Sequence, residues 1–90
     1  MHTIPDQPAL SRLFRMQWEE AQGNYVLLYP EGMVKLSQSA AEILKRCDGT
    51  HTVPAIVGEL EQAFNCGGLQ DDIDDFLRAA SERGWIVSAS

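Results

Sequence analysis

The densest group of ionisable side chains in the sequence is a set of four aspartates: Asp71, Asp72, Asp74 and Asp75. Neighbouring carboxylates can act in acid–base catalysis or bind a cation. A calcium loop counted from the first aspartate would need glycine at its sixth position and glutamate at its twelfth, where the sequence has Phe76 and Glu82. The aspartates also fall in the first turns of a predicted helix, where negative side chains interact favourably with the helix dipole. We therefore interpret them as an acidic helix face that could select a basic segment of a partner.

The cysteines and histidines offer one zinc-like set, namely Cys47, Cys66, His51 and His2, but it contains no Cys-x-x-Cys or His-x-x-x-His pair. Two cysteines do not make a disulfide framework, so both are predicted to be free thiols, with Cys47 in the core. No serine stands in a glycine-flanked nucleophile elbow. The glycine pair at 67–68 joins two predicted helices rather than a strand and a helix, so it is no phosphate loop. These patterns predict no enzyme, no metal and no cofactor.

Charge and hydropathy restrict the classes of partner that the protein could bind. The 90 residues carry 13 acidic and 7 basic side chains, a net charge of −6, and most of the acidity lies in the C-terminal half. A protein that binds nucleic acid needs a basic surface, so we expect no nucleic-acid partner. No apolar run approaches the ~18 residues of a membrane span, and the N-terminus lacks the order of a signal peptide. The sequence therefore predicts a cytoplasmic protein that does not enter a membrane.

Three predicted strands follow an N-terminal segment without periodicity. Residues 1–11 contain two prolines and are predicted to be a flexible arm, which leaves residues 12–90 as one domain. The first strand, Arg12 to Glu20, alternates apolar and polar side chains, with Phe14, Met16 and Trp18 on the face predicted to be buried. The strands Tyr25 to Tyr29 and Met33 to Leu36 follow after tight turns at 22–24 and 30–32. Two tight turns predict an antiparallel meander in the order 1-2-3.

After Leu36 the apolar period changes from two to 3.6, which is typical of helices. Ser37 or Ser39 is predicted to cap the first helix and Thr52 the second, and the third spans about Leu69 to Arg83. The apolar stripes of the three helices are Ala40, Ile43, Leu44 and Cys47; Val53, Ile56, Val57, Leu60 and Phe64; and Ile73, Phe76, Leu77 and Ala80. Gly84 ends the third helix, and Trp85 is expected to fold back on its last turn. Strands followed by helices indicate the α+β class, in a winged-helix-like layout of a three-stranded meander and a three-helix bundle.

The third strand of the meander is a candidate binding surface because it is predicted to lie at an edge of the sheet. Its only charge is Lys35, and the other side chains, Met33, Val34 and Leu36, are apolar. An extended peptide could add there as a fourth strand, through main-chain hydrogen bonds and neighbouring side-chain pockets. The pattern equally allows a short edge that is solvated or covered by the N-terminal arm.

One long stretch of the sequence resembles a known family. Leu28 to Leu36 (LYPEGMVKL), followed by Ala40 to Leu44 (AAEIL) and by Cys-Asp-Gly at 47–49, is similar to the PqqD family of pyrroloquinoline quinone (PQQ) biosynthesis. The similarity covers roughly residues 8–87. The cap at 37–39 reads Ser-Gln-Ser where an Asn-x-Thr type is more usual, which is a conservative exchange among capping residues.

The resemblance implies a RiPP recognition element, a domain that binds a ribosomally made precursor peptide. It implies a peptide chaperone that binds the precursor PqqA and presents it to the radical SAM enzyme PqqE. The implied peptide contacts lie on the third strand and the third helix, at Met33, Val34, Lys35, Leu36, Asp72, Asp75, Phe76, Ala79 and Arg83.

Two alternatives from other classes stay open. The predicted topology alone would also suit a winged-helix DNA-binding or regulatory module, although a net charge of −6 argues against DNA. An open edge strand and the tight turn at 30–32 would also suit a homodimer formed by strand exchange.

Overall fold

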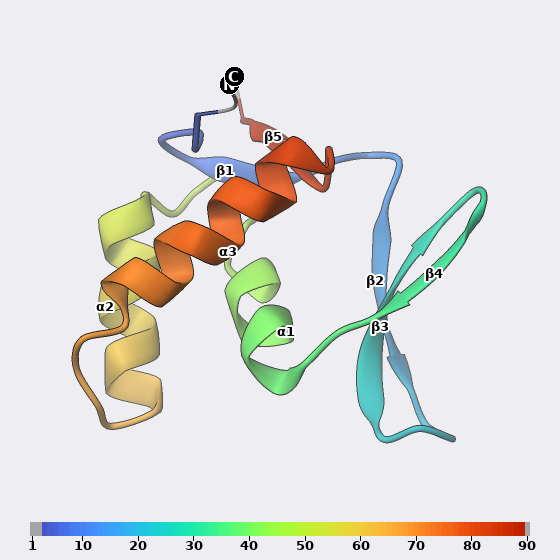
Figure 1. Ribbon diagram of the computed structural model, residues 1–90, viewed down its shortest axis with the longest axis horizontal. Coiled ribbons are helices and arrows are strands. Elements are labelled where there is room, and N and C mark those ends of the chain that lie inside the picture. Colours follow the sequence, from blue (N-terminus) through green and yellow to red (C-terminus); the bar gives the residue numbers. More distant parts are fainter. Residues whose placement is uncertain (1–2, 90) are drawn as a thin grey trace.

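The structure, a computed structural model, describes residues 3–89. The elements in chain order are β1 (Pro8–Leu10), β2 (Arg15–Glu19), β3 (Asn24–Tyr29), β4 (Gly32–Lys35), α1 (Gln38–Lys45), α2 (Val53–Ala63), α3 (Gln70–Glu82) and β5 (Ile86–Ser88). Strands β2, β3 and β4 form an antiparallel sheet in that order, which confirms the predicted α+β class. In Figure 1 this sheet stands to one side of the three helices, and α3 runs diagonally between α1 below it and the strands β1 and β5 above it.

The helix starts follow from their capping residues. The Oγ of Ser37 accepts a hydrogen bond from the backbone N–H of Ala40 at 3.1 Å, so Ser37 and not Ser39 caps α1. Thr52 caps α2 in the same way, by accepting from Ala55 at 3.3 Å. Glu42 does not complete a capping box with Ser39, because its carboxylate pairs with basic residues one turn further along α1.

The core lies where the three helices meet the inner face of the sheet, and it confirms most of the predicted apolar stripes. Buried members are Leu27, Leu36, Ala40, Ala41, Ile43, Leu44, Cys47, Ile56, Val57, Leu60, Ile73, Leu77, Ala80 and Ile86. Two predictions of burial are wrong. Phe64 is 41% exposed because α2 ends at Ala63, and Trp18 is 48% exposed although its strand neighbours Phe14 and Met16 pack against the core.

Residues 8–10 correct the prediction of a flexible arm over residues 1–11. They form β1, which pairs with β5 in a second, two-stranded antiparallel sheet. Further backbone bonds hold this strand, including those from Leu10 N–H to Cys47 at 3.0 Å and from Gly49 N–H to Pro8 at 3.0 Å. The predicted first strand of the meander, Arg12 to Glu20, is correspondingly shorter, because residues 11–14 form a turn closed by the Phe14 N–H and the Ser11 carbonyl.

The helices of the described residues are short. None of them is both long and apolar enough to cross a membrane.

Candidate functional site

Strand β4 presents a free edge. Among the described residues it pairs only with β3, so its outer side has no strand neighbour. The N–H of Leu36 donates to the carbonyl of Tyr25 at 3.0 Å, which identifies these two as a hydrogen-bonded pair of the antiparallel ladder. Because hydrogen-bonded and non-bonded pairs alternate, Val34 also faces β3, while the N–H and C=O groups of Met33 and Lys35 point outward.

A hollow of about 620 Å³ lies between β4 and the end of α3. Its apolar wall is aromatic, since the Phe14 and Tyr29 rings lie 5.6 Å apart. Opposite them, the Arg83 guanidinium lies 5.4 Å from the centre of the Trp85 ring. The complete lining is Phe14, Tyr29, Glu31, Val34, Arg83 and Trp85.

A second hollow, of about 210 Å³, continues along α3 toward its N-terminus. It is bounded by Ser37 and Ser39 at the start of α1, and by Asp72 and Phe76 on α3. The Phe76 ring of this hollow lies 6.4 Å from the Trp85 ring of the first, so the two hollows are neighbours along α3. We refer to the two hollows together as the β4–α3 groove.

The nine residues expected to bind a peptide are placed in different ways. Four of them line the groove: Val34, Arg83, Asp72 and Phe76. Met33 and Lys35 are exposed and contribute the outward backbone groups of the edge, whereas Leu36 is buried in the core.

The remaining two lie beside the groove rather than in it. Asp75 is exposed and pairs with Arg78 at 3.2 Å, and Ala79 is half-buried one turn before Arg83. Four residues that line the hollow beside β4 were not among the nine, namely Phe14, Tyr29, Glu31 and Trp85. The expected fold-back of Trp85 onto the last helical turn was the one sequence signal for this wall, and its N–H does donate to the carbonyl of Ala80 at 2.9 Å.

The start of α3 is stabilised by a partner outside the helix. Leu69 makes no side-chain cap, but its N–H donates to Glu61 Oε2 at 3.1 Å. Asp71 and Asp72 stand in the first turn, where they complement the helix dipole as predicted. The acidic residues therefore have a structural role at the helix start, and Asp72 in addition faces the groove.

The cysteines and histidines do not come together. Burial raises the pKa of the Cys47 thiol to about 12, while Cys66 is exposed in the connection between α2 and α3. His51 contacts Asp48 at 3.0 Å and Glu59 at 2.9 Å. His2 lies outside the described residues, and within residues 3–89 no group of three or more histidine, cysteine or acidic side chains has an arrangement that could hold a metal ion.

The fold is that of a RiPP recognition element. A solution NMR structure of the PqqD truncation of Methylobacterium extorquens PqqCD, described as a functional and stand-alone recognition element of this kind, superimposes with a TM-score of 0.73. The match has 27% sequence identity and covers 97% of this chain and 95% of that one.

The family follows from sequence similarity. The model of the family "Coenzyme PQQ synthesis protein D (PqqD)" matches residues 24–86, and the chain belongs to this family. A PqqA binding protein of Azotobacter vinelandii is 52% identical over 85 residues, covering 93% of this chain and 92% of the relative. One of Methylococcus capsulatus is 51% identical over 77 residues, covering 86% and 83%.

Proposed function

We propose that this protein is a peptide chaperone of PQQ biosynthesis that binds a PqqA-type precursor and presents it to the radical SAM enzyme PqqE. The observation that carries the proposal is the free edge of β4 beside the β4–α3 groove. The names of the relatives supply the identity of the peptide, since they are PqqA binding proteins at about half sequence identity.

The peptide binds as an added strand along β4. Met33 and Lys35 offer two N–H donors and two carbonyl acceptors at the outer edge. Main-chain hydrogen bonds of this kind give affinity without reading sequence. Sequence preference comes from the side chains of the peptide that enter the groove between Val34 and Trp85, where aromatic rings provide apolar contact area.

The charges of the groove orient the peptide. Asp72 lies toward the N-terminal end of α3, whereas Arg83 follows its C-terminal end and shares that hollow with Glu31, so the two ends of the groove differ in charge. A peptide with a basic residue near Asp72 and an acidic residue near Arg83 fits this arrangement, and the reversed direction places like charges together.

The proposal is tested with a proline that removes one outward donor. Val34 is unsuitable because its N–H faces β3, whereas proline at position 33 deletes an N–H that the sheet does not use. We expect Met33→Pro to weaken binding of the synthetic precursor by roughly tenfold in titration calorimetry, as loss of one buried hydrogen bond implies.

The matched control is Met16→Pro, which removes an outward N–H from the opposite edge strand, β2. It should leave the precursor affinity within about twofold of the unmodified protein. Equal losses in both variants would show that the proline acts through the stability of the sheet, and an unchanged affinity in Met33→Pro would contradict strand addition at β4.

A further inference from the structure

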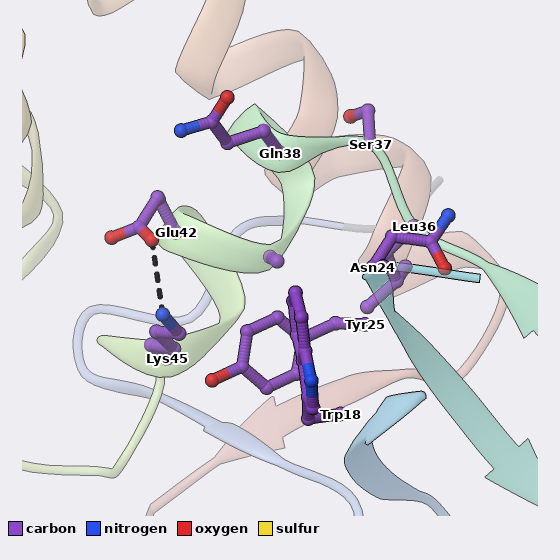
Figure 2. A pocket seen from close by; sticks show the side chains of 10 residues that line it. Trp18, Asn24, Tyr25, Leu36, Ser37, Gln38, Glu42 and Lys45 are labelled. Atoms are coloured by element: carbon purple, nitrogen blue, oxygen red, sulfur yellow. Dashed lines mark hydrogen bonds and ion pairs between the residues drawn. The ribbon is translucent and has the colours of Figure 1, made fainter. Parts of the chain in front are cut away.

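A pocket of about 560 Å³ lies on the side of α1 that faces away from the β4–α3 groove. Figure 2 shows Trp18 and Tyr25 standing against α1, with Glu42 and Lys45 on one side and Leu36 and Ser37 on the other. We call it the Trp18 pocket. The groove uses Ser39, Ala40 and Ile43 of the same helix, so α1 lies between the two sites and its cap Ser37 lines both.

The aromatic wall of the Trp18 pocket is held in place by its neighbours. The Trp18 and Tyr25 rings meet edge to face with their centres 5.1 Å apart, and the Lys45 ammonium lies 4.5 Å from the centre of the Tyr25 ring. Lys45 is in turn paired with Glu42 at 3.0 Å. A wall that is ordered before binding reduces the entropy lost on association, and tryptophan and tyrosine are the residues that most often dominate protein interfaces.

The pocket adjoins a second free edge of the sheet. Within residues 3–89, β2 pairs only with β3, and the alternation of the ladder points the backbone groups of Met16 and Trp18 outward. Trp18 thus supplies both an exposed side chain in the pocket and a free N–H and C=O at its side. This combination suits an extended polypeptide segment, which can pair with the edge and insert one side chain.

A carboxylate without an ion pair stands beside Trp18. Glu20 accepts a hydrogen bond from Trp18 Nε1 at 2.8 Å, which holds its carboxylate next to the indole. It forms no ion pair with another described residue, whereas Glu42, which lines the pocket, is already balanced by Lys45 and Arg46. A segment that carries a basic residue next to its inserted side chain complements the charge of Glu20.

We infer that the Trp18 pocket and the free edge of β2 form the docking surface for the enzyme that modifies the bound peptide. The enzyme contributes an extended segment with a large apolar side chain next to a basic residue. The inference rests on the proposed function, since a presenting protein must hold the peptide and the enzyme at once. A peptide in the β4–α3 groove leaves this surface open, because the two sites lie on opposite faces of α1.

The test measures both affinities on the full chain, with the precursor peptide and with the radical SAM enzyme of the same organism. We expect Trp18→Ser to weaken enzyme binding by roughly tenfold or more and to leave peptide binding within about twofold. Leu13→Ser is the matched control, since Leu13 is 68% exposed and lies outside the pocket, and it should change neither affinity. Glu20→Lys, which leaves the apolar wall intact, should weaken enzyme binding most at low salt.

Three results would overturn the inference. In the first, both pocket variants keep the enzyme affinity of the unmodified protein. In the second, Trp18→Ser weakens peptide binding as much as enzyme binding, which would place the pocket within the peptide site. In the third, the unmodified protein is a dimer in light scattering and Trp18→Ser is a monomer, which would make a second copy the occupant. If the unmodified protein fails to bind the peptide, the proposed function itself fails, whatever the variants show.

Discussion

The two edges of the β2–β3–β4 sheet offer the same backbone groups in different surroundings. Beside β4 lies a groove lined by five aromatic rings, with Asp72 and Arg83 at opposite ends. Beside β2 lies the Trp18 pocket, with the Glu20 carboxylate hydrogen-bonded to its indole and an ion pair in its wall. The difference indicates that backbone pairing alone does not select a partner, and that the helix packed beside each edge does.

The largest expected effect is the loss of both binding surfaces through unfolding of the shared core. Leu27 is fully buried on the central strand beneath both edges, so Leu27→Ala should lower the free energy of unfolding by about 2 to 5 kcal/mol. Both binding activities should then fall together with the folded fraction. Urea denaturation measures the loss, with the exposed Leu13→Ala as the variant that should stay within about 0.5 kcal/mol. A stable Leu27→Ala protein would show that the edges do not depend on a shared core.

A smaller effect is expected where the two sites meet. Ser37 caps α1 between them, so Ser37→Ala should lower stability by about 1 kcal/mol. Ser39→Ala is the matched control, because Ser39 is exposed and does not cap the helix; thermal unfolding should separate the two by several degrees. Equal losses in the two variants would mean that the hydrogen bond between the two hydroxyls, at 3.2 Å, and not the cap, stabilises this turn.

The charge of the groove should appear in the salt dependence of peptide binding. Asp72→Asn removes a carboxylate that lines the groove, and it should lower peptide affinity a few-fold at low salt and less at high salt, since ions screen exposed charges. Asp71→Asn changes the adjacent carboxylate, which does not line the groove, and serves as the control. If both variants bind equally well at every salt concentration, the acidic helix face has no part in recognition.

The smallest expected effect is a pH dependence of stability that comes from His51, Asp48 and Glu59, a cluster outside both sites. The hydrogen bond to Asp48, with a further contribution from Glu59, raises the pKa of His51 above its ordinary value of about 6.5. The protonated form is therefore favoured in the folded state, and its stabilisation is complete below the unfolded pKa and lost as pH rises through the higher folded pKa. Denaturation at about pH 5.5 and pH 8.5 should show this loss, and His51→Gln should abolish it. Peptide and enzyme affinities that followed the His51 titration would connect the cluster to the sites.

The sequence predicted the elements whose pattern is long enough to be read. The helix limits followed from Thr52 and the apolar stripes, and the free edge of β4 followed from the strand order. Strands β1 and β5 were missed because three residues are too few to show alternation, and because Pro8 resembles the start of a loop.

The sequence could not show whether a given backbone N–H of an edge strand points toward the sheet or away from it. That direction depends on the register, which the backbone hydrogen bond from Leu36 to Tyr25 fixes. The exposure of Trp18 was also beyond the pattern, because burial along β2 does not follow the alternation of the sequence: Met16 and Glu19 are half-buried, whereas Trp18 is exposed. The groove itself required tertiary structure, since Phe14 and Trp85 lie at opposite ends of the chain.

The short β1–β5 ladder has a consequence for the way the domain can be attached to other chains. Pro8 stands opposite Ser88, so the polypeptide enters and leaves at neighbouring points, near the top of Figure 1. A tether that leaves the domain beside Pro8 therefore starts close to one that leaves beside Ser88. A short linker that joined the two ends would also permit circular permutation, with a new break in the exposed connection between α2 and α3.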